Sequence, residues 1–84
     1  MDVAFIRARI RQLIETGNLP CEPGKIWAGP GIGDTCVACA EPIDADELEF
    51  EVDLISGQTM RLHARCHGLW TEECEAEAGL ADRT

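Results

Sequence analysis

The sequence predicts an α+β fold, in which an N-terminal amphipathic helix precedes an antiparallel β-hairpin and a C-terminal helix. Three observations predict it: apolar residues recur at helical spacing over 3–16, alternate with acidic residues over 47–54, and return to helical spacing after residue 63. We expect a single small domain over residues 1–84, with a helix at 3–16, a connector at 17–35 and a cysteine- and histidine-bearing unit at 36–78.

The segment 3–16 places its apolar side chains on one stripe of a helix: Val3, Ile6, Ile10, Leu13 and Ile14. Asp2 is suited to the N-cap position, and Gly17 ends the run. Arg7 and Arg11 share the outer face, where we expect them in solvent, with Arg11 close to Glu15 four residues later. Contact of this arginine face with an acidic partner or RNA is the alternative.

The segment 17–35 holds three of the four prolines and five of the eight glycines, so we expect an irregular connector. Its "GPGIGD" stretch lacks the Gly-Lys-Ser/Thr ending of a P-loop and the strand-turn-helix setting of a dinucleotide-binding fingerprint. The glycines instead indicate a tight bend toward the cysteines that follow. Trp27 is expected in the core, where it would hold the connector down.

Residues 47–54, "ELEFEVDL", alternate between acidic and apolar side chains, which is typical of a half-buried strand. The apolar face consists of Leu48, Phe50, Val52 and Leu54, and the acidic face of Glu47, Glu49, Glu51 and Asp53. We expect the acidic face to be solvated and self-repelling, which discourages edge aggregation. Binding of a cation or of a basic partner there is the alternative.

The turn signal "SGQ" and the segment "TMRLH" follow, so the sequence predicts an antiparallel hairpin. A left-handed conformation at Gly57 would set Val52 against Met60 and Glu51 against Arg61. The alternative register would set Asp53 against Arg61.

Beyond His63, one side of a helix of roughly three turns carries Cys66, Leu69, Trp70 and Cys74. Trp70 is expected in the core. Gly79 is expected to end this helix, and the tail 80–84 is expected to fray.

The N-terminus shows no charged-then-apolar leader, and no run approaches the ~18 apolar residues that a transmembrane helix needs. We therefore expect a cytoplasmic protein without a membrane partner. Thiols stay reduced in the cytosol, and five cysteines cannot all pair, so a disulfide framework is not expected. Cys21 and Cys74 are interpreted as buried or half-exposed thiols, with metal coordination by either of them as the alternative.

The formal net charge of −9 is unevenly distributed along the chain. Residues 1–33 carry four basic and three acidic side chains, whereas residues 34–84 carry three basic and thirteen acidic ones. Such an acidic surface repels a phosphate backbone, so the expected partner is another protein rather than a nucleic acid. The sequence does not indicate an oligomeric state.

Two paired motifs, "CVAC" at 36–39 and "HARC" at 63–66, have the chemistry and spacing of a zinc site. Zinc prefers four tetrahedral ligands drawn from thiolate and imidazole, and two cysteines separated by two residues can turn toward one ion. The predicted ligands of one structural Zn²⁺ are Cys36, Cys39, His63 and Cys66. Four protein ligands would leave no coordination position for a water, so no catalytic residue and no enzymatic activity is expected.

His67 is the rival imidazole ligand. As the residue after Cys66 in a helix, it points about 100° away from that cysteine, so it would reach the ion only if the helix began late. We therefore expect His63 as the ligand and His67 exposed or hydrogen-bonded to a group behind the ligands.

The order of CxxC knuckle, β-hairpin and ligand-bearing helix resembles a treble-clef zinc finger. The stretch "LHARCHGLW" at 62–70 is similar to the segment that closes the first zinc site of LIM domains, and the gap between the motifs is nearer to that of the poly(ADP-ribose) polymerase type of finger. The resemblance covers residues 36–74. The second LIM zinc site and the DNA-contacting basic residues of the polymerase finger are absent from the sequence. Together with "WAGPG" at 27–31, the motifs also resemble a family of small bacterial proteins without an assigned activity.

The leading functional hypothesis is an interaction or adaptor module held together by zinc. One alternative is thiol redox chemistry at the CxxC, although thioredoxin-like sites place this motif at a helix start after a parallel strand. A second is a nucleic-acid-binding finger that uses the arginines: Arg7, Arg9, Arg11, Arg61 and Arg65. A nuclease of the His-metal-finger type would lack ligands, because only His67 remains once zinc is coordinated.

Overall fold

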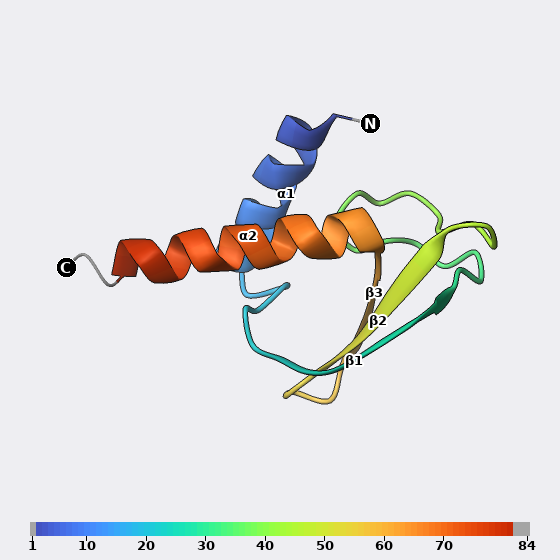
Figure 1. The fold of residues 1–84 in the computed structure, drawn as a ribbon. Helices are drawn as coiled ribbons and strands as arrows, with labels where there is room; N and C mark the ends of the chain where they lie inside the picture. Colours follow the sequence, from blue (N-terminus) through green and yellow to red (C-terminus); the bar gives the residue numbers. More distant parts are fainter. Residues whose placement is uncertain (1, 82–84) are drawn as a thin grey trace.

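The computed structural model describes residues 2–81, apart from the side chains of Pro23 and of residues 79–81. Its elements are α1 (Val3–Glu15), β1 (Pro23–Pro30), β2 (Leu48–Leu54), β3 (Thr59–His63) and α2 (Ala64–Ala81), in this order (Figure 1). The strands form one antiparallel sheet in the order β1-β2-β3. The predicted α+β class, with a helix at each end, is confirmed.

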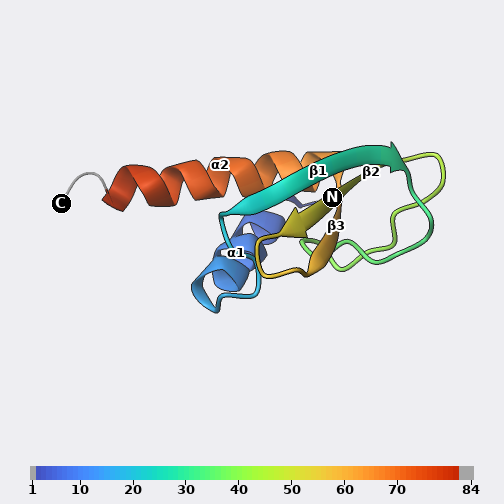
Figure 2. The same cartoon turned by 90° about the horizontal axis from the view of Figure 1, so that it is seen from below.

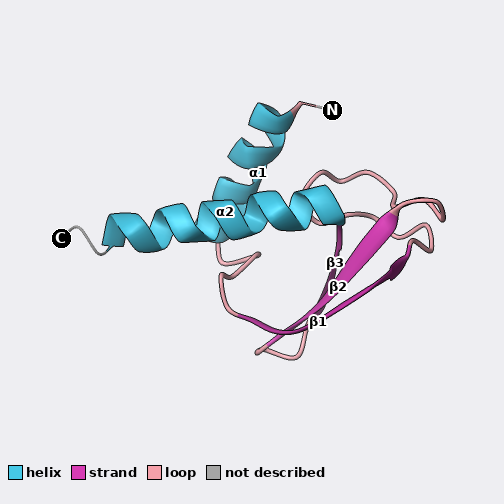
Figure 3. Cartoon of the chain, in the orientation of Figure 1, coloured by secondary structure: helices cyan, strands magenta, loops and turns pink. Residues whose placement is uncertain are grey.

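Helix α2 contacts the sheet at its N-terminal end and α1 near its middle (Figure 1). Because α2 begins at the residue after β3, its N-terminal end stays at the edge of the sheet (Figure 3). Helix α1 crosses α2, and the C-terminal part of α2 extends beyond both α1 and the sheet (Figure 2). The core lies between these elements and consists of Ile6, Ile10, Leu19, Cys36, Ala38, Ile43, Val52, Leu54, Leu62, Cys66, Leu69 and Trp70.

Helix α1 forms as its sequence predicts. The Asp2 side chain accepts a hydrogen bond from the N–H of Phe5 at 3.3 Å, and Gly17 beyond the end of the helix adopts a positive φ of 78°. Of the predicted apolar stripe, Ile6 and Ile10 are buried, whereas Val3 remains exposed at the first turn.

The expected solvated arginine face of α1 is wrong. Arg7 binds Glu72 at 2.8 Å and Glu73 at 3.1 Å, and Arg11 also binds Glu73 rather than Glu15. The Glu73 side chain is only 8% exposed, so its carboxylate depends on these two guanidinium groups for compensation. They lower the pKa of Glu73, with the hydrogen bond from Arg11 as the largest cause. Long-range charge pairs, which the helical pattern alone does not reveal, thus join α1 to α2.

The connector is not irregular throughout, because it contains the edge strand β1. Lys25, Ile26 and Trp27 pair with Asp53, Val52 and Glu51 of β2. The ladder shifts between Pro23 and Lys25, and Pro23 and Pro30 stand at the two ends of the strand. Prolines and glycines interrupt the alternating pattern by which a strand is predicted from sequence. An edge strand nevertheless tolerates prolines, because one side of it need not donate hydrogen bonds. The predicted core position of Trp27 is also wrong, since 49% of this residue is exposed.

The glycines of the predicted tight bend allow two chain segments to lie close together. Gly31 is buried, and a Cβ at this position would collide with the carbonyl oxygens of Ile43 and Asp44. The N–H of Gly31 donates to the carbonyl of Glu47 at 3.0 Å, and that of Gly33 donates to Ile43 at 2.9 Å. The bend is therefore fixed against the segment that leads from the CxxC motif into β2.

The predicted hairpin and its register are confirmed. Val52 lies opposite Met60 and Glu51 opposite Arg61, while Gly57 has a positive φ of 97°. The acidic face is not simply solvated: Arg61 binds Asp34 at 3.0 Å, Glu49 at 3.2 Å and Glu51 at 2.9 Å. Glu49 is buried at 5% exposure, because this arginine compensates its charge. Leu48, expected on the apolar face, is 49% exposed.

Helix α2 is longer than predicted and continues past Gly79 to Ala81. A single glycine in a helix costs only about 1 kcal/mol relative to alanine, so it need not end the helix. Of the tail expected to fray, residues 82–84 lie outside the described residues. Among the described residues, no helix combines the length and the apolar character that crossing a bilayer requires.

Cys21 and Cys74 are not free thiols, because they form a disulfide that links the segment before β1 to α2. Their Cα atoms are 5.5 Å apart, and 53 positions separate them in the sequence. In the chain-entropy model, closing a loop of this length raises the free energy of the unfolded chain by about 4 kcal/mol and so stabilises the folded state. The predicted free thiols at Cys21 and Cys74 are therefore wrong, because that prediction depends on a reducing compartment.

Candidate metal centre

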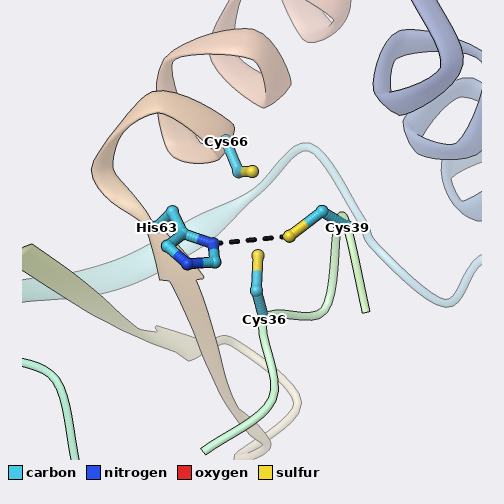
Figure 4. Close-up of side chains that lie close together, drawn as sticks. All are labelled: Cys36, Cys39, His63 and Cys66. Carbon is cyan, nitrogen blue, oxygen red and sulfur yellow. Dashed lines mark hydrogen bonds between the residues drawn. The ribbon is translucent and has the colours of Figure 1, made fainter. Parts of the chain in front are cut away.

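Three separate parts of the fold bring the predicted ligands together. Cys36 and Cys39 lie in the turn after the glycine-rich bend, His63 is the last residue of β3, and Cys66 lies in the first turn of α2. All four side chains point toward a common centre in Figure 4. Their donor atoms lie within 4.8 Å of one another, so the cluster could hold a metal ion.

The turn that presents the two cysteines of the CxxC motif is closed by backbone hydrogen bonds. The N–H of Ala40 donates to the carbonyl of Cys36 at 2.9 Å, and the N–H of Cys36 donates to Glu41 at 2.8 Å. Ala40 adopts a left-handed φ of 64°, which costs a non-glycine residue about 1–2 kcal/mol. The N–H of Val37 donates to the carbonyl of Arg61 at 2.9 Å, which attaches the turn to β3. This bond holds the turn beside Arg61, which lies two residues before His63 in β3.

The other two side chains are placed by the junction of β3 and α2. His63 and Cys66 are three residues apart across this junction, so the imidazole leaves the strand end and the thiol leaves the first helical turn (Figure 4). Both residues are buried, with exposures of 3% and 0%. Cys36 is also fully buried, whereas Cys39 is half-buried.

The distances suit tetrahedral coordination. His63 Nδ1 lies 3.4 Å from Cys39 Sγ, which is the contact drawn as a dashed line in Figure 4. With metal–sulfur and metal–nitrogen bonds of about 2.3 and 2.05 Å, the sulfur–nitrogen edge of a regular tetrahedron is about 3.6 Å long. This pair is thus already spaced as two ligands of one ion, and no two donor atoms of the cluster are more than 4.8 Å apart.

Without a metal, the three thiols divide their protons unequally. A hydrogen bond with the Cys66 side chain is the largest cause that lowers the pKa of Cys36, to about 4. The same interaction, followed by burial, raises the pKa of Cys66. Burial is the main cause that raises the pKa of Cys39. One thiolate at Cys36, stabilised by neighbouring protonated thiols, is the expected state at neutral pH.

A carboxylate stands behind the histidine. His63 Nε2 lies 3.4 Å from Glu47 Oε1, on the opposite side of the ring from the nitrogen that faces Cys39. The N–H of Asp44 donates to the same oxygen at 3.1 Å, and this bond is the largest cause that lowers the pKa of Glu47, ahead of His63. Metal-bound histidines commonly donate their second ring N–H to such a carboxylate, which fixes the tautomer and the ring orientation. Glu47 is therefore a site residue that the acidic-face interpretation missed.

His67, the rival ligand, is not part of the cluster. Its ring packs 4.7 Å from that of Phe50 and 5.7 Å from that of Trp70, measured between ring centroids. Burial lowers the pKa of His67, which favours the neutral imidazole. Trp70 is 2% exposed, as predicted. The two remaining cysteines form the disulfide and do not join the cluster.

The arrangement is consistent with a zinc finger. Comparisons of the chain with protein-family models, with curated proteins and with solved structures gave no match.

The protonation of the thiols predicts a proton release on metal binding. Because the raised pKa values of Cys39 and Cys66 favour the protonated thiols and the lowered pKa of Cys36 favours its thiolate, zinc should release about two protons per ion from the thiols. Isothermal titration calorimetry in buffers of different ionisation enthalpy measures this number. Uptake of zinc without any release of protons would contradict the proposed thiol states.

Replacing Glu47 by glutamine should weaken zinc binding by about 10- to 100-fold, because the neutral amide no longer stabilises the oriented imidazole. A competition titration with a chromogenic chelator measures the dissociation constant. Glu41→Gln removes an equal charge from an exposed side chain beside the same turn and serves as the matched control. Equal affinities for the two variants would show that Glu47 does not support His63.

Proposed function

We propose that the protein is a small zinc-binding domain with one structural ion, held by Cys36, Cys39, His63 and Cys66 in a treble-clef arrangement. The observation that carries this proposal is the convergence of four donor atoms within 4.8 Å from three separated parts of the chain. Three neighbouring thiols, two of them buried, suit a metal site, and none of the three forms a disulfide.

The donor set favours zinc over other divalent ions. Three thiolates and one imidazole are soft to borderline ligands, which suit tetrahedral zinc and do not suit Mg²⁺ or Ca²⁺, since both of these prefer oxygen. Apparent binding energies of structural zinc in finger peptides are about 10–16 kcal/mol at neutral pH. A core of this size contributes only about 3–5 kcal/mol, so bound zinc would dominate the stability of the hairpin and α2.

The proposed role of the ion is structural rather than catalytic. Four protein ligands complete a tetrahedron and leave no position for a reacting water or substrate. The burial of Cys36, His63 and Cys66 supports the same assignment, because a substrate would have to displace packed core residues to reach the ion.

Metal content and folding test this proposal together. The purified protein should contain one zinc ion per chain by elemental analysis and native mass spectrometry, and a chelator or the substitution Cys39→Ser should unfold the hairpin and α2. Circular dichroism and amide NMR spectra measure the unfolding. The double variant Cys21→Ser/Cys74→Ser is the matched control: it removes the disulfide and should keep the zinc. Unchanged amide spectra after both chelation and Cys39→Ser would reject the proposal.

We further propose that the domain acts as a protein-interaction module through β1. This strand is one of the two edge strands of the sheet, and it exposes Trp27 by 49% and Ile26 by 45%. Tryptophan is among the residues most enriched at the centres of protein interfaces. A cytoplasmic location stays a prediction from the sequence, and the Cys21–Cys74 disulfide requires exposure to oxidising conditions.

Two features weigh against the alternative functions. The CxxC motif lies in a turn rather than at the start of a helix, which differs from the thioredoxin arrangement. Arg7, Arg11 and Arg61 all bind carboxylates, so they are already neutralised and are poorly suited to contact a phosphate backbone.

Substitution of Trp27 by alanine should abolish capture of the specific partner from cell extract. The chain should still fold, because about half of this residue is exposed and it lies in an edge strand. Ile55→Ala is the matched control, since Ile55 is 75% exposed at the hairpin turn. Quantitative mass spectrometry of captured proteins and thermal melting measure the two effects. If Trp27→Ala and Ile55→Ala capture the same proteins in the same amounts as the original chain, β1 is not the interaction surface.

A further inference from the structure

An apolar pocket of about 340 Å³ lies between β1 and α2, away from the four-residue cluster, and the Cys21–Cys74 disulfide forms part of its wall. The other wall residues are Ile26, His67, Trp70, Thr71, Glu75 and Ala78. A volume of this order is enough for a small organic molecule. The two sulfurs therefore border a space that a ligand can enter.

The five cysteines differ sharply in accessibility. Cys21 is exposed and Cys74 is half-buried, whereas Cys36 and Cys66 are completely buried. Thiol–disulfide exchange requires a thiolate to approach a sulfur of the bond, so access decides which sulfurs react. Because Cys21 is an exposed residue in the wall of the pocket, the disulfide can be approached from the Cys21 side.

The charges around the pocket select among thiols. Glu75 lies in the wall, Glu22 follows Cys21 in the chain, and Glu77 lies two residues beyond Glu75. Within the described part of the chain, none of these three carboxylates forms an ion pair, whereas the neighbouring Glu72 and Glu73 are bound by arginines. An uncompensated negative field repels anionic thiols and attracts cationic ones.

The basic residue nearest in sequence does not cancel this field. Lys25 precedes Ile26 in β1, and successive strand residues point to opposite faces, so Lys25 faces away from the pocket that Ile26 lines.

We propose that the Cys21–Cys74 disulfide is a thiol-exchange site for a small, positively charged thiol of the aminothiol class, whose apolar part enters the pocket between β1 and α2. The thiolate of the aminothiol attacks Cys21 Sγ and forms a new S–S bond with it. The Cys21–Cys74 bond breaks, and its electron pair leaves on Cys74 Sγ, which takes a proton from water. The thiolate of a second aminothiol attacks the aminothiol sulfur of the mixed disulfide, and the bond to Cys21 breaks. Its electron pair leaves on Cys21 Sγ, which takes a proton from water, so the protein disulfide is reduced and two aminothiols become one small disulfide.

This exchange would change the contact between the segment before β1 and α2, and would leave the metal-site cluster unchanged. In the described chain, β1 has close backbone contacts with β2 but none with α2, and the disulfide is the covalent link across the pocket. Reduction therefore frees the segment before β1 from α2. The cluster of Cys36, Cys39, His63 and Cys66 lies outside the pocket and keeps its geometry.

The test compares two thiols with the same two-carbon chain and opposite charge, cysteamine and 2-mercaptoethanesulfonate. Exchange of the oxidised, zinc-loaded protein is followed by mass spectrometry after alkylation, and rates are expressed per thiolate. The ratio of the two rates is then divided by the ratio measured with a neutral reference, bis(2-hydroxyethyl) disulfide. We expect a corrected preference for cysteamine of about tenfold at low salt, which falls toward one at about 1 M salt.

A corrected ratio near one at low salt would overturn the proposal. It would also be overturned if both thiols react with the protein no faster than with the reference disulfide. The titration of two free thiols at Cys21 and Cys74 in the protein purified under oxidising conditions would overturn it as well. Glu75→Gln should reduce the preference about two- to threefold, because it removes one charge from the wall. The matched control Asp46→Asn removes one charge from an exposed turn that does not line the pocket, and should leave the ratio unchanged.

Discussion

The direct passage of β3 into α2 is the constraint on which the rest of the structure depends. Because no residue separates His63 from Ala64, the direction in which the strand ends also sets where the helix begins. His63 and Cys66 therefore leave the backbone close together, and α2 must cross the end of the sheet. The turn of Cys36 and Cys39 completes the cluster from a third direction, held to β3 by the hydrogen bond of Val37 to Arg61. The organisation of the C-terminal half thus follows from one junction and one backbone contact.

Charge compensation provides a second level of organisation. The chain has 16 acidic side chains and only seven lysines and arginines, so each arginine can meet several carboxylates. Arg61 gathers three of them around the acidic side of β2, and Arg7 with Arg11 attaches α1 to α2 through Glu72 and Glu73. Exposed pairs of this kind contribute little individually, but those that include the buried Glu49 and Glu73 prevent an uncompensated charge in a partly apolar setting.

The sequence predicted the features that depend on local spacing and missed those that depend on distant residues. The hairpin register followed from matched apolar faces and from Gly57, and the four clustered residues followed from two short motifs. The same register places Glu49 opposite His63. Glu47 lies two residues before Glu49 and therefore on the same face of the strand, so the register indicates a carboxylate close to the histidine. Strand β1, the Cys21–Cys74 pair and the Arg7–Glu72 contact join residues far apart in the chain, and no local pattern specifies such partners. The predicted burial of Trp27 fails for the same reason, because burial requires a packing partner from elsewhere in the chain and the residue is 49% exposed.

The division of the five cysteines into a cluster of three and a disulfide of two bears on how the chain reaches its native form. During oxidation, five free thiols could join in several wrong combinations. An ion taken up early by Cys36, Cys39 and Cys66 would withdraw those sulfurs from oxidation, since metal-bound thiolates inside a packed shell are shielded from oxidants. Only Cys21 and Cys74 would then remain to join. In that sequence of events the metal would direct the formation of the correct disulfide, although it would contact neither of the two sulfurs that pair.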